Sequence, residues 1–194
     1  MTMLLTLDNI ACVRGDRLLF KNLSLRLDRG DALWIQGPNG TGKSSLIRLA
    51  AGLLRPFSGT VTRRERCALL DESLALDAER PLRAALNIWG RIDGVDGTAT
   101  VRAMQAMALT NLSDIPVAML STGQRKRAAM ARVIASGAPI WLLDEPANGL
   151  DSNAITLLVA AIAAHRQNGG AVLIASHFAL GLESLRSLDL KDFS

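Results

Sequence analysis

The sequence predicts an α/β fold with a mainly parallel sheet core, an antiparallel N-terminal sheet and an inserted helical subdomain. Short apolar runs at 32–36, 140–143 and 171–175 are bounded by polar or turn residues. Such runs are typical of parallel strands covered on both faces. Residues 23–28 instead alternate leucine with polar side chains, the period of a strand with one buried face. From about 80 to 119 the chain carries no strand signal, which indicates a helical insertion.

Length and composition favour a single soluble domain over residues 1–194, with the helical subdomain at about 80–135. The chain is 49% apolar and 21% charged, an ordinary globular balance. Its longest apolar stretches, 157–164 and 171–175, are shorter than the roughly 20 residues that cross a bilayer. Residues 1–12 lack the basic start of a secretory signal. We therefore expect a cytosolic chain, and its net charge of +4 does not indicate nucleic acid binding.

Four further segments carry helix signals, and the first of them follows a strand. The strand at 32–36 is followed by a Gly-rich loop and then by helical character at 43–49. Segments 82–92 and 100–109 are predicted helices around a Gly-rich turn at 94–97. The last predicted helix, 153–167, has apolar residues at helical spacing and ends in two glycines, a plausible stop signal.

Two cysteines, Cys12 and Cys67, are present without CxxC spacing or a neighbouring histidine cluster. This pattern suggests neither a metal site nor a disulfide framework. Free cysteine is among the most often buried residue types, so both are expected to be reduced core thiols.

A phosphate-binding motif follows the strand at 32–36. Residues 37–44 read GPNGTGKS, which matches the P-loop pattern GxxxxGK[ST] between a strand and a helix. Glycines allow successive N–H groups to face one anion, and the helix adds its positive end. We expect Lys43 to reach the β- and γ-phosphates and the Ser44 hydroxyl to bind Mg²⁺, as in P-loop NTPases. The predicted nucleotide-binding residues here are Gly37, Pro38, Asn39, Gly40, Thr41, Gly42, Lys43, Ser44 and Ser45.

An acidic pair closes the apolar strand that starts at Ile140. Asp144 lies where a parallel sheet places its ligand groups, so it is expected to hold Mg²⁺ through water. Glu145 is the candidate general base for an attacking water. Two acids after a strand are usually only a solvated strand end, but the P-loop in the same chain favours a catalytic role.

Three further segments resemble those of ABC ATPases. Residues 120–124, LSTGQ, are similar to the LSGGQ signature; 148–151, NGLD, resemble the D-loop; and His177 matches the switch histidine. A P-loop kinase or GTPase has no reason to carry the signature. The resemblance covers essentially the whole chain and implies catalytic roles for Lys43, Glu145 and His177. It also implies nucleotide contacts from Ser121, Thr122, Gly123, Gln124 and Asp151.

The residues of the signature themselves explain why this segment can bind a phosphate. Ser121 can cap the helix that continues to Ile134, so its hydroxyl and the Gly123 N–H lie at a positive helix end suited to a phosphate. In the family that phosphate is the γ-phosphate on the other subunit, which implies a head-to-tail dimer held by ATP. His177 is then expected to hydrogen-bond the γ-phosphate and orient the water. Four basic residues after the signature are expected to form a solvated helix face: Arg125, Lys126, Arg127 and Arg132.

More narrowly, the chain is similar to the ATP-binding subunit of the cytochrome c maturation (system I) haem exporter. The similarity lies in residues 12–27, in QGPNG at 36–40, in the small size and in Thr122. It implies ATP and Mg²⁺ as cofactors, multispanning membrane permease subunits and a second, identical ATP-binding subunit as partners, and a peripheral place on the cytoplasmic face of the inner membrane. Direct haem binding is not expected, because no CxxCH motif is present. The alternatives are another ABC exporter, of drugs or lipids, or a soluble ABC ATPase of cofactor assembly.

Two positions depart from the pattern of ABC ATPases. Their glutamine after the P-loop helix has no counterpart in 69–73, LLDES, where Glu72 is the candidate metal ligand instead. The aromatic residue that stacks on adenine is also missing near Val13 and Arg14, so Arg14 is the candidate for stacking on the base.

Overall fold

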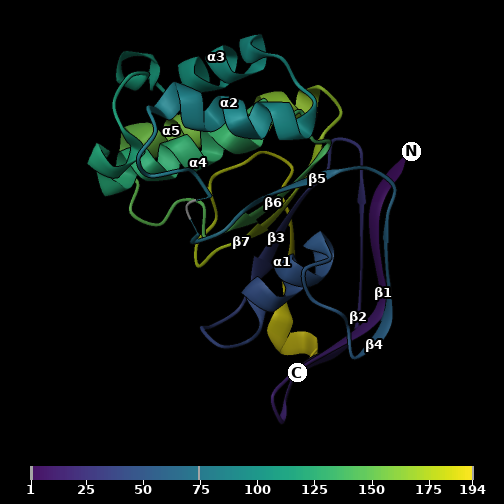
Figure 1. Cartoon of the computed structure of the whole chain (residues 1–194). Coiled ribbons are helices and arrows are strands. Elements are labelled where there is room, and N and C mark those ends of the chain that lie inside the picture. The colour runs from purple at the N-terminus through teal and green to yellow at the C-terminus, as the bar shows by residue number, and fades with distance from the viewer. Residues whose placement is uncertain (1, 74, 194) are drawn as a thin grey trace.

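A five-stranded parallel sheet forms the centre of the fold (Figure 1). The computed structural model describes residues 2–73 and 75–193. The strand order is β5-β6-β7-β3-β8, and each pairing in it is parallel. The predicted strands at 32–36 and 171–175 are β3 and β7, and the predicted strand at 140–143 is β6, which is one residue longer. These strands confirm the predicted α/β fold class. The strands are β3 (Ala32–Gln36), β5 (Cys67–Leu70), β6 (Ile140–Asp144), β7 (Ala171–Ala175) and β8 (Arg186–Asp189).

An antiparallel sheet of three strands, in the order β2-β1-β4, packs beside this core. Leu23, Leu25 and Leu27 are all buried, as their alternation with polar residues predicts. Sequence patterning did not identify β4, whose residues are exposed at all but one position. The strands are β1 (Met3–Arg14), β2 (Arg17–Asp28) and β4 (Ser58–Arg63).

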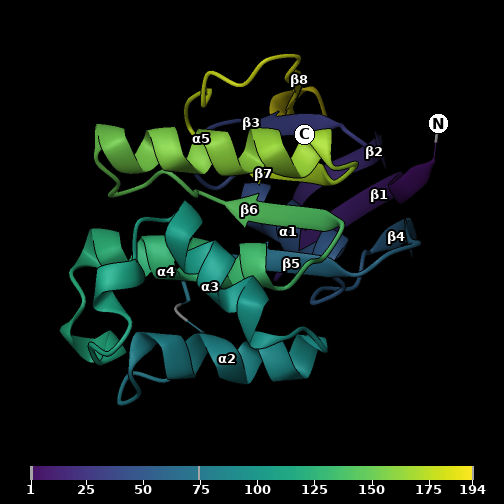
Figure 2. The same ribbon diagram turned by 90° about the horizontal axis from the view of Figure 1, so that it is seen from above.

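The helices lie on both sides of the parallel sheet. Figure 1 shows α2 to α5 grouped on one face of the strands and α1 on the other face, next to the antiparallel sheet, and in Figure 2 α4 lies between α5 and α2. The third predicted helix is displaced: it begins at Gly97, inside the predicted turn, because Asp96 caps it, and it ends at Ala106. The helices are α1 (Lys43–Ala51), α2 (Leu82–Asp93), α3 (Gly97–Ala106), α4 (Thr122–Ala135) and α5 (Ser152–Gln167).

Two hydrophobic cores meet at the parallel sheet, which explains its uninterrupted apolar strands. Ile140 and Leu142 of β6 pack with α1 and the antiparallel sheet. Trp141 and Leu143, the alternate residues, pack with α2 to α5. Because successive side chains of a strand point to opposite faces, both faces of β6 are covered. In the described part of the chain, no helix is long and apolar enough to span a bilayer.

Two of the smaller predictions need correction. Three of the four basic residues of α4 do not form a solvated face, because the side chains of Lys126, Arg127 and Arg132 donate to backbone carbonyls. Arg127 donates to Met107 O at 2.8 Å, and Lys126 donates to Glu145 O at 3.4 Å. Cys12 is buried as expected, whereas Cys67 is only partly buried.

Candidate active site

The P-loop joins the end of β3 to the start of α1 and curls around the Lys43 side chain. Its glycines Gly37, Gly40 and Gly42 have φ angles of 139°, 80° and 105°, a region that favours glycine. The Lys43 ammonium donates to Gly37 O at 2.7 Å and to Pro38 O at 3.2 Å, and the side chain is buried. The lysine is therefore already held inside the loop that would receive a phosphate.

Asp144, the last residue of β6, places a carboxylate beneath the P-loop helix. Burial raises the pKa of the Asp144 carboxyl, and the Ser44 hydroxyl and the Arg48 charge oppose that rise. Its Oδ1 atom is buried without a hydrogen-bond partner among the described residues. A buried oxygen of this kind is costly unless a cation or donor meets it, so the site fits a divalent ion that Ser44 and Asp144 share.

Glu145 follows in a strained conformation. Its φ is 47°, a value that non-glycine residues seldom adopt and that persists where the surrounding structure enforces it. The Glu145 N–H donates to Ala175 O at 2.8 Å and thereby continues the pairing of β6 with β7. The Glu145 side chain is buried, and its Oε2 atom lacks a partner in the described structure. Strain and an unsatisfied acid at one residue are typical of a functional group.

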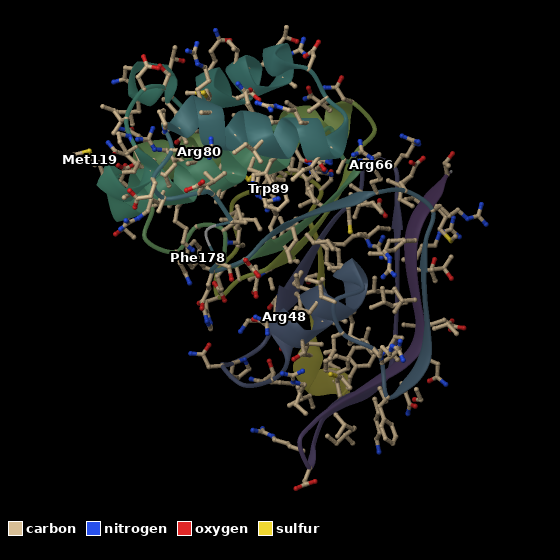
Figure 3. The ribbon with its side chains drawn as sticks, viewed as in Figure 1. Arg48, Arg66, Arg80, Trp89, Met119 and Phe178 are labelled. Carbon is tan, nitrogen blue, oxygen red and sulfur yellow. The ribbon has the colours of Figure 1, made fainter. Side chains whose placement is uncertain are left out.

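His177 reaches the same place from the loop after β7. Its Nε2 atom lies 3.2 Å from Glu145 Oε1. The loop is fixed on either side of the histidine: Trp34 Nε1 donates to Ser176 O at 3.0 Å, and Ser176 Oγ donates to Phe178 O at 2.6 Å. Phe178 itself projects at the edge of the molecule (Figure 3).

A cavity of about 400 Å³ unites these groups. Most of the predicted P-loop residues line it, together with Glu72, Glu145 and His177. Asp144 is not among the lining residues. Leu19 and Asn148 were not predicted as site residues. Asn148 could have been found from its place in the D-loop, whereas Leu19 carries no signal. The lining residues are Leu19, Asn39, Gly40, Gly42, Lys43, Ser44, Ser45, Glu72, Glu145, Asn148 and His177.

Among the described residues that line this cavity, none is an aromatic platform for the base end of a nucleotide. Leu19, from β2, contributes to the lining, and Arg14 does not. The prediction that Arg14 stacks on the base therefore receives no support from this arrangement, and Leu19 is the apolar side chain that the cavity offers.

The signature lies outside the cavity of its own chain. Ser121 caps α4 in a reciprocal capping box: Gln124 N donates to Ser121 Oγ at 3.2 Å, and Ser121 N donates to Gln124 Oε1 at 2.8 Å. Ser121 and Thr122 are exposed. Asp151 instead caps α5, accepting from Ala154 N at 2.7 Å. The predicted residues 121–124 and Asp151 thus do not meet the P-loop within one copy.

The fold has counterparts among solved structures of ABC ATPases. The ATP-binding subunit of an ABC transporter superposes with a TM-score of 0.83 at 22% identity, covering 90% of this chain and 80% of that one. A nucleotide-free ATP-binding cassette from an ABC transporter gives 0.76 at 20% identity, over 91% and 82% of the two chains. At these identities the comparison establishes the fold.

The sequence comparisons establish the family. Residues 20–148 match the family described as ABC transporter. The chain is 70% identical over 188 residues to the cytochrome c biogenesis ATP-binding export protein CcmA of Sphingopyxis alaskensis, covering 97% of each chain. It is 56% identical to the protein of that name from Novosphingobium aromaticivorans, over 95% of this chain and 94% of the other. The chain therefore belongs to the ABC transporter family, as an ATP-hydrolysing subunit of the cytochrome c biogenesis export type.

Proposed function

We propose that the chain binds ATP with Mg²⁺ in the cavity beside the P-loop and hydrolyses it there to drive export for cytochrome c biogenesis. The observation that carries the proposal is the convergence of Lys43, Ser44, Glu145 and His177 on one cavity at the carboxyl ends of parallel strands. Such a place is where open α/β sheets bind their ligands.

The metal and the phosphates would be held by groups that the cavity already orients. Ser44 and Asp144 supply the oxygen ligands that Mg²⁺ prefers, and Glu72 at the cavity wall supplies a third oxygen ligand. When bound, the ion offsets the charge that develops on the transferring phosphoryl group. Lys43, now donating to Gly37 O and Pro38 O, exchanges those carbonyls for phosphate oxygens.

Glu145 and His177 are the proposed catalytic groups, Glu145 as the general base and His177 as the group that orients it. Glu145 accepts a proton from the attacking water, whose oxygen bonds to the γ-phosphorus as the bond to the leaving ADP oxygen breaks. His177, 3.2 Å from Glu145, orients that carboxylate and the γ-phosphate. The strained backbone of Glu145 fixes the direction of its side chain before a nucleotide arrives.

A complete site requires two copies. Ser121 and Gly123 stand at the exposed N-terminal end of α4, where the helix favours an anion, and do not line the cavity of their own chain. We infer a head-to-tail homodimer in which each ATP lies between one P-loop and the partner's signature. Loss of the γ-phosphate removes the bridge and reopens the dimer.

The dimer would work on multispanning permease subunits at the cytoplasmic face of the inner membrane, with haem as the exported cargo. Support comes from the names of the relatives, which are export proteins of cytochrome c biogenesis. Co-purification from native membranes tests this: the chain should be released by detergent together with a permease. Recovery in the soluble fraction alone would favour a cofactor-assembly ATPase.

Glu145→Gln tests the catalytic part. The amide cannot accept the proton of water, so hydrolysis should stop while ATP binding persists, and the ATP-bridged dimer should accumulate. Gel filtration with ATP and Mg²⁺ should show a species of dimer size. A monomer-sized species that retains ATP, or unchanged hydrolysis, would contradict the proposal.

A further inference from the structure

The segment that carries Glu72 is held on both sides by two side chains that contact each other. Arg132 of α4 donates to Leu69 O in β5, before Glu72. The indole N–H of Trp89 in α2 donates to Ala75 O, after Glu72. The Arg132 guanidinium carbon lies 5.0 Å from the centroid of the Trp89 ring. Figure 3 shows Trp89 on the side of the helical layer that faces the sheets.

Glu72 itself stands between the nucleotide cavity and α4. It lines the nucleotide cavity and also a second cavity of about 140 Å³. Thr122, Arg125 and Lys126 of α4 line the other side of that second cavity. The Glu72 side chain is exposed, so packing among buried side chains does not set its place. Its charge acts on the buried Asp144 carboxyl, whose pKa it raises.

The chemistry of Arg132 and Trp89 allows one guanidinium to make two kinds of contact at once. A planar guanidinium can donate in its plane to a carbonyl and stack its face on an indole at the same time, which an ammonium cannot do. Burial lowers the pKa of Arg132, whereas the charges of Asp93 and Asp71 oppose that shift. Arginine remains charged throughout the physiological range, so changes of pH within that range do not remove the charge that both contacts use.

We propose that Arg132 and Trp89 are positioning residues, which hold Glu72 at the wall of the nucleotide cavity and so set the Mg²⁺ requirement of ATP hydrolysis. This inference rests on the proposed function of the cavity. Neither residue touches the nucleotide site; both act through the backbone carbonyls of Leu69 and Ala75.

Two substitutions each remove one of the hydrogen bonds to the segment that carries Glu72. Arg132→Met deletes the guanidinium but keeps most of the stem, and Trp89→Phe keeps an aromatic ring but deletes the N–H. The matched control is Arg127→Met, because Arg127 lies on the same helix and also donates to backbone carbonyls, but to those of Met107 and Ala108.

The first readout is the affinity for Mn²⁺, a paramagnetic substitute for Mg²⁺, measured by electron paramagnetic resonance with a non-hydrolysable ATP analogue bound. The second is ATP hydrolysis by the chain assembled with its membrane partner, at fixed ATP over a range of Mg²⁺ concentrations. Loss of a residue that orients a metal ligand commonly weakens metal affinity by about 10–100-fold. We expect Arg132→Met and Trp89→Phe to raise the half-saturating Mg²⁺ concentration about tenfold, at the lower end of that range, and Arg127→Met to leave it unchanged. If Arg132→Met does not fold, Trp89→Phe decides the question alone.

A double-mutant cycle with Glu72→Ala separates positioning from general damage. If Arg132 acts through Glu72, Arg132→Met should add no further shift in a chain that already carries Glu72→Ala. Additive shifts, equal shifts in Arg127→Met, or no shift from Glu72→Ala would each overturn the inference. Those outcomes leave the proposed function intact, whereas a lack of Mg²⁺-dependent hydrolysis by the unsubstituted chain would contradict the proposed function itself.

Discussion

Replacing Gly42 with alanine tests whether the P-loop needs a residue without a side chain at the start of α1. Gly42 has φ 105° and ψ 14°. A Cβ atom there would lie 3.0 and 3.1 Å from two ring carbons of Phe20 and 3.2 Å from the Leu19 Cβ. The Phe20 ring is fully buried, so it cannot move aside without disturbing the core.

The expected loss of stability at Gly42 has a backbone part and a packing part. A non-glycine residue in a sparsely populated region costs about 1–3 kcal/mol. The upper half of that range applies here, because 105° lies beyond the left-handed basin near +50 to +70°. Overpacking adds about 1–3 kcal/mol, and alanine restores about 0.4–1 kcal/mol by restricting the unfolded chain. We expect a net decrease of about 2–6 kcal/mol in the free energy of unfolding.

Gly40→Ala is the matched control. Gly40 also has a positive φ, 80°, but a Cβ atom there meets nothing within 4 Å. Only the backbone part remains, so its net cost should be about 1 kcal/mol. Urea denaturation gives both free energies of unfolding, and titration with a fluorescent ATP analogue shows whether the loop still binds. Equal losses in the two variants, or a stable Gly42→Ala that binds ATP normally, would refute the steric argument.

Two further predictions concern a helix cap and a buried histidine. Ser121→Ala removes the hydroxyl that accepts from Gln124 N, so urea denaturation should show a loss of about 1 kcal/mol, and ATP-dependent dimerisation should weaken. Unchanged dimerisation on gel filtration would count against a contact between Ser121 of one copy and the nucleotide bound by the other. Burial lowers the pKa of His165 from 6.5 to about 4, so the unfolded chain takes up its proton first and stability falls as the pH drops through that interval. The loss is at most about 3 kcal/mol, reduced by solvent screening at this partly exposed ring. His165→Phe keeps the stack on Trp141 but cannot take up a proton. Between pH 7.5 and 5 its free energy of unfolding should therefore fall less than that of the unsubstituted chain, by an amount on the order of that loss. Equal falls in the two chains would contradict the lowered pKa of His165.

Local chemistry explains what could be predicted from the sequence. The strand β6 is visible because both of its faces are buried, which makes every residue from Ile140 to Leu143 apolar. The P-loop is visible because its backbone needs glycines at fixed places. Ser121 could be identified as a helix cap because the cap and its partner Gln124 are three residues apart.

The features that escaped prediction depend on contacts between distant segments. The strand β8 is short and partly polar, and it is a strand because β3, about 150 residues earlier, pairs with it. Leu19 reaches the cavity because the hairpin of β1 and β2 places it there. Arg132 reads as a surface charge until the carbonyl of Leu69 and the ring of Trp89 are brought beside it.

Cross-linking between two copies tests most directly whether each ATP lies between one P-loop and the partner's signature. One copy carries Asn39→Cys and the other Thr122→Cys, at exposed positions, and both carry Glu145→Gln and Cys67→Ala. With ATP and Mg²⁺, a short bifunctional thiol reagent should join the two different chains, and with ADP it should not. No cross-link with ATP, or an equal yield with ADP, would contradict the shared site.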